Sequence, residues 1–272
     1  MDDKVSVLMS VYHNEVPDYF RKAIQSMLDQ TVVPQEFVIV ADGPLTPDLE
    51  AVLTDYQQQY PTIFSIYHLK HNHGLAYALA YGLQRCRNNL VARMDADDIA
   101  APQRLAWSLQ AMQRGHYDVY GGQTAEFDGD ESNIVAYRNV PLKQTAIMKF
   151  AHRRNPMNHM SVMYKRDKIL KIGNYRAFDG FEDYDLWVRA LQAGYHFGND
   201  RHVFVYVRAG EEMMTRRGGF DYLKRNIKMR LVFYKEHFYN WRDLIITLGG
   251  VTATNLLPPK LRYLIYYKLL RK

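Results

Sequence analysis

Short apolar runs alternate with stretches of helical period along the first third of the chain. The apolar runs, each bounded by turn or polar residues, cover residues 5–9, 37–41, 64–67 and 90–94. The stretches between them, at 19–30, 48–60 and 75–86, each place apolar side chains along one helical stripe. This alternation predicts an α/β fold in which helices cover both faces of a mostly parallel sheet.

The pattern continues, less regularly, to about residue 207. Short strands are predicted at 119–121, 161–164 and 203–207, and helices at 142–153 and 184–193. From residue 220 the chain reads as helical and rich in aromatic residues, with a break at Pro258 and Pro259. We therefore predict one α/β domain over residues 1–219 and a C-terminal helical, basic segment over 220–272.

Polar residues gather where each of the first four predicted strands ends. They occupy 12–15 after the first strand, Asp42 and Gly43 after the second, 71–74 after the third and 95–98 after the fourth. Ligands of parallel sheets bind beyond the carboxyl ends of the strands. The sequence thus predicts that four strand ends converge on one site.

Charge is unevenly distributed along the chain. Of 272 residues 47% are hydrophobic, enough for a sizeable core, and the net charge is +6. Residues 221–272 hold eleven Lys and Arg against three acidic residues, so this segment is near +8 and the remainder near −2. A basic end favours contact with an anionic lipid surface over nucleic-acid binding, and a solvated basic helix pair is the alternative.

Nothing in the sequence suggests export or a membrane span. Cys86 is the only cysteine and cannot form an intrachain disulfide, which weakly favours a reducing compartment. The first residues lack the basic and long apolar regions of a signal peptide. The weakly polar stretch 244–257 is too short for the roughly 20 apolar residues of a transmembrane helix. We expect a cytoplasmic protein, peripheral on the inner face of the plasma membrane.

The run Met94-Asp95-Ala96-Asp97-Asp98 places three carboxylates directly after a strand. A hard divalent cation, Mn²⁺ or Mg²⁺, bound by one or two carboxylates and substrate phosphates would balance them. Helix capping by Asp97 or Asp98 is the alternative, but it accounts for only one aspartate. Neither GxGxxG nor GxxxxGK[ST] follows the first strand, which argues against a dinucleotide oxidoreductase or a P-loop kinase.

Five sequence elements, in this order, resemble a family 2 glycosyltransferase of the GT-A fold. They are residues 7–12 with Glu15, 40–44, 72–75 with Ala78 and Gly82, 92–98 with Pro102 and Arg104, and 181–187 with Arg189. Each element alone is weak, whereas the ordered set is specific. Arg216-Arg217-Gly218-Gly219 and the basic end resemble transferases that build bacterial O-antigen, capsule or lipopolysaccharide core.

The resemblance implies a donor site for a nucleotide diphosphate sugar. Asp42 would accept a hydrogen bond from the uracil imide, Asp97 with Asp95 would hold the metal, and Arg216 and Arg217 would close as a lid or form an exposed turn. The implied nucleotide-sugar residues are Val11, Tyr12, Glu15, Asp42, Asn72, Gly74, Arg93, Asp95, Asp98, Arg216 and Arg217. Many relatives carry a histidine near the metal, but residues 207–212 contain none. The metal would then rely on Asp97, phosphate and water.

The resemblance also implies a catalytic base and an acceptor site. Asp183 would deprotonate the acceptor hydroxyl for a single, inverting displacement, with Glu182 or Asp185 as possible substitutes. These residues open a predicted helix whose apolar side would turn the carboxylates outward, and capping is the alternative. His159 and Trp187 would adjoin the acceptor, with Asn158 and Arg153 nearby, although a core histidine fits almost equally.

The expected function is inverting transfer of a hexose from a UDP-sugar to a saccharide or a polyprenyl-diphosphate-linked sugar. One alternative is a metal-dependent nucleotidyltransferase, which would use a glycine-rich or basic phosphate loop after the first strand; residues 11–15 supply none. The other is a non-enzymatic membrane-binding protein, which would leave Asp95, Asp97 and Asp183 without a role.

Overall fold

The structure is a computed structural model that describes residues 4–178, 180–209 and 219–256. Within these ranges nine strands form one sheet in the order β3-β2-β1-β4-β8-β6-β9-β5, with β7 paired to β6. The strands are β1 (Val5–Val11), β2 (Glu36–Ala41), β3 (Phe64–His68), β4 (Leu90–Arg93), β5 (Ile99–Ala100), β6 (Val119–Phe127), β7 (Ile134–Arg138), β8 (Met163–Lys165) and β9 (Phe197–Arg208). Only β5, β7 and β8 oppose the common direction, so the sheet is mostly parallel, as predicted.

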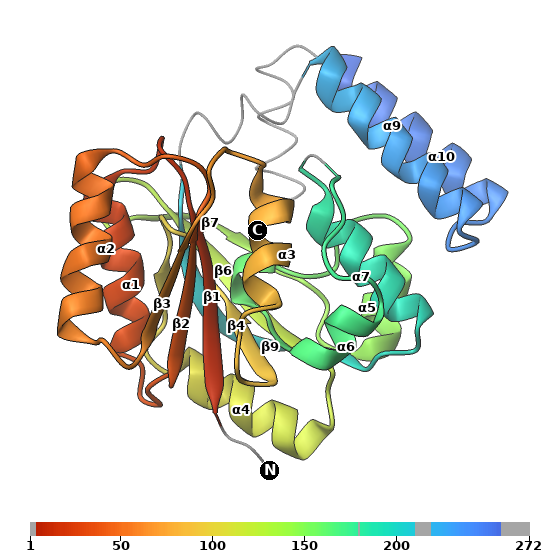
Figure 1. Cartoon of the computed structure of the whole chain (residues 1–272). Coiled ribbons are helices and arrows are strands. Elements are labelled where there is room, and N and C mark those ends of the chain that lie inside the picture. Colours follow the sequence, from red (N-terminus) through yellow and green to blue (C-terminus); the bar gives the residue numbers. More distant parts are fainter. Residues whose placement is uncertain (1–3, 179, 210–218, 257–272) are drawn as a thin grey trace.

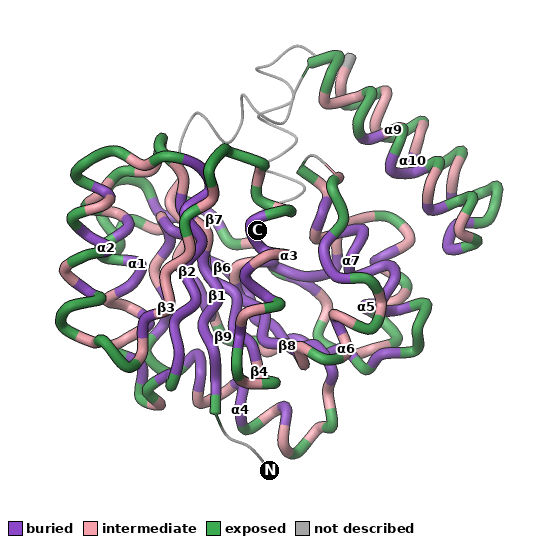
Figure 2. The backbone as a smooth tube through the Cα atoms, viewed as in Figure 1, coloured by how far each residue is buried: buried purple, intermediate pink, exposed green. Residues whose placement is uncertain are grey.

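Helices cover both faces of the sheet (Figure 1). One layer consists of α1 (Pro17–Leu28), α2 (Pro47–Gln59) and α4 (Arg104–Gly115), and the other of α3 (Leu75–Leu83), α5 (Gln144–Ala151), α6 (Arg166–Lys171) and α7 (Glu182–Gln192). Along β1, Val7 and Met9 join the first layer and Leu8 the second, the period-two pattern of a strand. Figure 2 shows these central strands buried along most of their length.

Glycines set two close approaches that shape the interior. A Cβ at Gly82 of α3 would lie 2.5 Å from Leu8 Cδ1, so the glycine lets α3 pack tightly on β1 and fixes its amino-terminal end near the strand ends. In β6, a Cβ at Gly122 would lie 2.3 Å from the ring of Phe204 in β9. That contact explains a glycine within a strand that runs well beyond the predicted 119–121.

The last described helices form a hairpin beyond α7. α9 (Phe220–Lys235) and α10 (Trp241–Leu256) lie side by side (Figure 1), and α9 places Met229 and Phe233 in the same apolar core as α7. The hydroxyls of Tyr184 in α7 and Tyr239 in the hairpin turn are 3.1 Å apart. None of the helices in the described ranges has the length and apolar character needed to cross a bilayer. The predicted domain boundary at residues 219 and 220 stays a prediction.

Candidate active site

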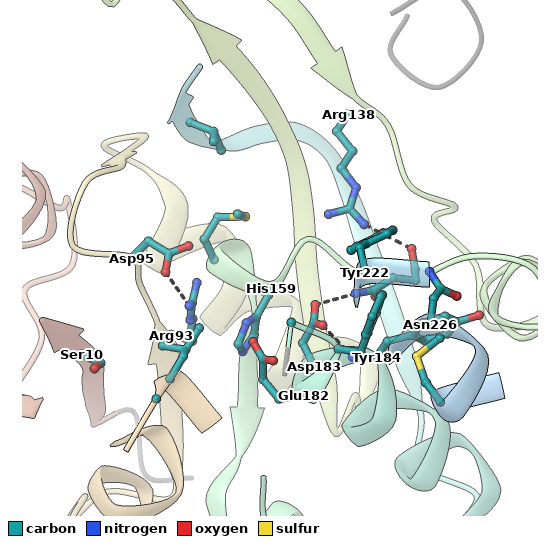
Figure 3. Close-up of a pocket in the computed structure, with 18 of the residues that line it drawn as sticks. Ser10, Arg93, Asp95, Arg138, His159, Glu182, Asp183, Tyr184, Tyr222 and Asn226 are labelled. Carbon is teal, nitrogen blue, oxygen red and sulfur yellow. Dashed lines mark hydrogen bonds and ion pairs between the residues drawn. The ribbon is translucent and has the colours of Figure 1, made fainter. Parts of the chain in front are cut away.

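A cavity of about 780 Å³ opens where β1, β2 and β4 end and where α7 begins. Most of the residues predicted for the site line this one cavity: Tyr12, Glu15, Asp42, Asn72, Gly74, Arg93, Asp95, Asp97, Asp98, His159, Glu182 and Asp183. The convergence arises because parallel strands place their carboxyl ends at one edge of a sheet. Figure 3 shows Arg93 and Asp95 on one side of the cavity and Glu182 and Asp183 on the other.

The end of β2 is closed by a network around Asp42. Its two carboxylate oxygens accept hydrogen bonds from the backbone N–H groups of His73 and Gly74, each at 2.8 Å. Gly43 has a φ of +88°, and a Cβ there would lie 2.7 Å from the backbone nitrogen of Asn72. Asp42 thus holds the start of α3, and it also lines the cavity. Its contact with uracil stays a prediction.

Arg93 is buried beside the aspartate turn, which we define as residues 95–98. It forms an ion pair with Asp95, while its Nε and Nη1 atoms have no hydrogen-bond partner in the described structure. Burial alone would lower the pKa of Arg93, but the charge and hydrogen bond of Asp95 raise it. A buried guanidinium with open donors that lines the cavity is suited to an anionic ligand.

The carboxylates of the aspartate turn differ in their burial and in their hydrogen-bond partners. Asp98 is 2% exposed, accepts a hydrogen bond from the backbone N–H of Arg208, and has a pKa raised well above its usual range by burial and by Asp97 and Asp95. Asp97 is half-buried and faces the cavity. No group of three His, Cys, Asp or Glu side chains within the described ranges could hold a metal ion without other ligands.

This donor set nevertheless fits a divalent cation that is shared with substrate. Asp95 is paired with Arg93, Asp98 accepts a hydrogen bond from Arg208, and Asp97 lines the cavity; the predicted role of Asp97 as a metal ligand stays a prediction. Mg²⁺-type sites commonly use one or two carboxylates and complete their coordination with phosphate and water. A cation here would also relieve the mutual repulsion that raises the pKa of Asp98.

Glu182 and Asp183 begin α7, and both face the cavity. Burial, with help from the charge of Asp183, raises the pKa of Glu182 to about 7. Burial also raises the pKa of Asp183, against the opposing charge of Arg138 and a hydrogen bond from the Asn155 amide. Two adjacent carboxyl groups with raised pKa values provide a base near neutral pH.

Three predicted site residues lie elsewhere. Trp187 is fully buried among core rings and does not line the cavity, so this geometry lends no support to its predicted contact with the acceptor, which stays a prediction. Asp185 is fully buried and pairs with Arg189 at 2.8 Å, so it cannot replace Asp183 as the base. The side chain of Val11 is buried in the core rather than in the cavity wall. The helical period of α7 turns Asp185 and Trp187 inward, and the alternation of faces along strand β1 does the same for Val11.

His159 and its neighbours are held by structural contacts. His159 Nε2 lies 3.0 Å from the hydroxyl of Tyr175, and burial lowers its pKa well below its usual range, so the ring is neutral. Asn158 is fully buried and donates to the backbone oxygens of Gly122 and Arg138. His159 still contacts the cavity, so its role toward an acceptor stays a prediction. The predicted lid residues Arg216 and Arg217 lie outside the described residues.

Sequence reasoning missed most of the basic wall on the far side of Asp183. Arg138 at the end of β7, Arg154 after α5 and Arg230 in α9 all line the cavity, and Arg153, which the sequence placed near the acceptor, lies beside Arg154. These arginines are dispersed over about ninety positions of the sequence and belong to no motif. Only the folded structure brings these arginines together, and no pattern in the sequence could have grouped them.

Comparison with known proteins identifies relatives among glycosyltransferases. The family model for glycosyl transferase family 2 matches residues 6–173. An uncharacterised glycosyltransferase from Haemophilus influenzae is 36% identical over 270 residues, covering 99% of this chain and 100% of the relative. The amylovoran biosynthesis glycosyltransferase AmsE from Erwinia amylovora is 35% identical and covers 97% of this chain and 98% of its own length.

A third relative carries a specific activity in its name. The UDP-Gal:alpha-D-GlcNAc-diphosphoundecaprenol beta-1,3-galactosyltransferase from Escherichia coli is 33% identical over 270 residues, covering 99% of this chain and 97% of the relative.

Solved structures show the same fold at low sequence identity. The mannosyltransferase PcManGT from Pyrobaculum calidifontis, in complex with GDP-Man and Mn²⁺, has a TM-score of 0.65 and 15% identity, covering 97% of this chain and 81% of its own. The 1–349 fragment of S. aureus TarS in complex with UDP-GlcNAc has a TM-score of 0.64 and 16% identity, and the match covers 97% of this chain and 86% of that fragment. The GT-A fold expected from the sequence is thereby confirmed.

Proposed function

This chain belongs to glycosyl transferase family 2, and from that premise we propose that it transfers a hexose from a UDP-sugar to a saccharide or polyprenyl-diphosphate-linked acceptor, with inversion, in the synthesis of a bacterial surface polysaccharide. Membership makes the chain a glycosyltransferase and replaces both the nucleotidyltransferase and the non-enzymatic alternatives. The observation that carries the proposal is a single cavity that holds the aspartate turn opposite Glu182 and Asp183.

The donor side of the cavity fits a nucleotide diphosphate sugar. Tyr12, Glu15 and Asp42 come from the first two strand ends and border one region, which we assign to the base and ribose. Arg93 supplies open guanidinium donors near the predicted phosphate position. Uridine is favoured because one relative is named for UDP-Gal and one structural neighbour holds UDP-GlcNAc. The sugar is galactose, glucose or an N-acetylated form of either.

We assign the role of general base to Asp183. Its carboxylate would take the proton of the acceptor hydroxyl as that oxygen attacks the anomeric carbon. The new glycosidic bond forms as the bond from the anomeric carbon to the β-phosphate oxygen breaks, and UDP leaves with the electron pair. A single displacement of this kind inverts the anomeric configuration. The amide of Asn155 holds the Asp183 carboxylate in place by a hydrogen bond.

A Mn²⁺ or Mg²⁺ ion, when bound with the donor, would neutralise the charge that develops on the leaving diphosphate. Asp97, with Asp95 nearby, is the part of this chain that would hold it. Arg93 engages Asp95 and so fixes the orientation of the turn. Support for a metal comes from the carboxylate geometry described above and from the Mn²⁺ complex of a structural neighbour.

Thermal unfolding with UDP, GDP, CDP and ADP, each with and without Mn²⁺, tests the donor proposal without an acceptor. A ligand that binds only the folded state adds about 2.7 kcal/mol at a hundredfold excess over its Kd. We expect stabilisation by UDP that depends on Mn²⁺. Stabilisation by another nucleotide alone would overturn the uridine assignment, and stabilisation by none would argue against the whole donor site.

We also propose that the C-terminal hairpin and tail contact a membrane surface. Trp241, Ile245 and Ile246 of α10 are each more than half exposed, which is unusual for large apolar side chains of a soluble surface. They lie in the segment 221–272 that carries eleven basic residues. Apolar and basic side chains together suit the interface of an anionic bilayer. The basic tail itself, residues 257–272, lies outside the described residues.

Co-sedimentation with vesicles tests this surface. Vesicles with and without an anionic lipid would be compared for the full chain, for a variant that lacks residues after Leu257, and for Trp241→Glu combined with Ile245→Glu. We expect the full chain to bind only the anionic vesicles and both variants to bind less. Equal binding by all three proteins would refute the proposed membrane contact.

A further inference from the structure

The cavity has a basic wall that the donor site does not use. We define it by Arg138, Arg154 and Arg230, which come from β7, the turn after α5 and α9. Arg153 also lines the cavity, where it forms an ion pair with Asp243. The other three arginines face a ligand space that is shared with Asp183.

Arg230 is the most constrained member of this wall. It is 6% exposed, its Nε donates to Asn226 Oδ1 at 2.8 Å, and its Nη1 donates to the Tyr239 hydroxyl at 3.2 Å. Both partners are neutral, and among the described residues no carboxylate forms an ion pair with Arg230. A buried guanidinium without an anionic partner is costly, which favours an anion from outside the chain.

Hydrogen bonds connect Arg230, through Tyr239, to Tyr184, the residue that follows the proposed base. The Tyr239 hydroxyl, which accepts a hydrogen bond from Arg230, lies 3.1 Å from the Tyr184 hydroxyl. The Tyr184 hydroxyl donates a hydrogen bond to the Ala151 backbone oxygen at 2.6 Å. Tyr184 directly follows Asp183, so the position of Arg230 is fixed relative to the base. An anion held by Arg230 would therefore have a defined distance from Asp183.

Arg138 and Arg154 extend the wall. Arg138 donates to the backbone oxygen of Asn155 at 3.3 Å, and Figure 3 shows it on the same side of the cavity as Asp183 and Asn226. Arg154 places its guanidinium 5.4 Å from the centre of the Phe150 ring, a contact that restricts its orientation. Arginine is suited to phosphate because its planar fork can donate two parallel hydrogen bonds.

The opposite side of the cavity carries the carboxylates of Asp95, Asp97 and Asp98. Arg93 on that side is already paired with Asp95, so an anion is disfavoured there unless a metal offsets the remaining negative charge. We infer that Arg138, Arg154 and Arg230 form a second anion site, which holds the phosphate groups of a lipid-linked acceptor while Asp183 faces the acceptor sugar. The identity of this ligand as an acceptor rests on the proposed function. The donor diphosphate is thereby assigned to the side of the aspartate turn, which needs a metal, and the acceptor diphosphate to the side of the arginines, which does not.

Titration calorimetry with geranyl diphosphate in buffer containing EDTA tests the site directly. Without metal, the aspartate turn should not take a diphosphate, so binding reports the arginines. We expect the wild type to bind geranyl diphosphate but not geraniol, and Arg138→Met, Arg154→Met and Arg230→Met each to weaken binding by about tenfold or more. Arg201→Met, at an exposed position of β9 away from the cavity, is the matched control and should bind as the wild type does.

Two further measurements separate the outcomes. Each variant is first tested for stabilisation by UDP with Mn²⁺, because retained stabilisation shows that the fold and donor site are intact. Arg138 and Arg154 are only half-buried, so their variants should fold and can still test the site if the Arg230 variant does not fold. Anionic vesicles are then added. Variants that lose vesicle binding but keep geranyl diphosphate would assign the arginines to bilayer headgroups and overturn the inference.

Unchanged affinity in all three variants, or binding that appears only with Mn²⁺, would also overturn it. A higher donor KM with unchanged geranyl diphosphate binding would place the donor, not the acceptor, at this wall. The calorimetric test needs no sugar transfer, so its result stands apart from the proposed function. That function fails instead if UDP with Mn²⁺ gives no stabilisation.

Discussion

The two sides of the cavity solve the problem of binding phosphate in opposite ways. The donor side presents Asp95, Asp97 and Asp98 and requires a cation between protein and ligand. The acceptor side presents Arg138, Arg154 and Arg230, which can contact phosphate directly. Asp183 and Glu182 lie on the side of Arg138, opposite Arg93 and Asp95. The difference teaches that metal dependence can discriminate between two chemically similar ligands in one cavity.

The largest effect is expected at the proposed base, Asp183. Asp183→Asn removes the proton acceptor, so kcat should fall by about a thousandfold, within the usual range for general bases. Donor binding should persist, because the aspartate turn is unaffected. Steady-state kinetics together with UDP-dependent thermal stabilisation would measure both. Near-normal turnover in Asp183→Asn, with loss of turnover in Glu182→Gln, would move the base to Glu182.

Glu182 should make the stability of the protein depend on pH. Its pKa is near 7 in the folded state and about 4.5 when unfolded, so the folded state binds more protons between these values. Stability should therefore fall as pH rises from about 4.5 to above 7, by about 3 kcal/mol from this group. Denaturant unfolding measured across that pH range should show that the free energy of unfolding falls less steeply with pH in Glu182→Gln than in the wild type. An identical pH dependence in the two proteins would contradict the raised pKa.

Metal removal should separate the two sides. EDTA, or Asp97→Asn in the presence of Mn²⁺, should abolish the stabilisation by UDP, a loss of about 2.7 kcal/mol at a hundredfold excess of ligand. Geranyl diphosphate should bind Asp97→Asn as it binds the wild type, because the arginines need no cation. Differential scanning fluorimetry and calorimetry would report the two ligands. If Asp97→Asn weakened both, the sides would not be independent.

The smallest effect is a shift in the pH profile of turnover. The charge of Arg138 lowers the pKa of Asp183, so Arg138→Gln should raise that pKa and move the acid limb of kcat to higher pH. The neutral saccharide acceptor should be used, so that loss of phosphate binding does not obscure the result. Arg201→Gln serves as the charge-matched control, with no expected shift. An acid limb common to all three proteins would place Arg138 too far from the base.

The two sides also differ in how well the sequence could predict them. The donor side was predictable because its residues follow strands, and the alternation of strands and helices brings strand ends together without further information. The acceptor side was not, because Arg138 and Arg230 lie on elements far apart in the chain. The short strands β5 and β7 were also missed, since two to five residues carry too little periodicity to stand out.

Local sequence determined the fold class, the aspartate turn and the position of Asp183 at the start of a helix. Tertiary structure decided which side chains of that helix face the ligand: Asp183 lines the cavity, while Asp185 pairs with Arg189 and Trp187 fills the core. It also brought Arg138, Arg154 and Arg230 together on one wall. The reason is physical: strand and helix periods are written in neighbouring residues, whereas burial and charge pairing depend on elements that meet only after folding.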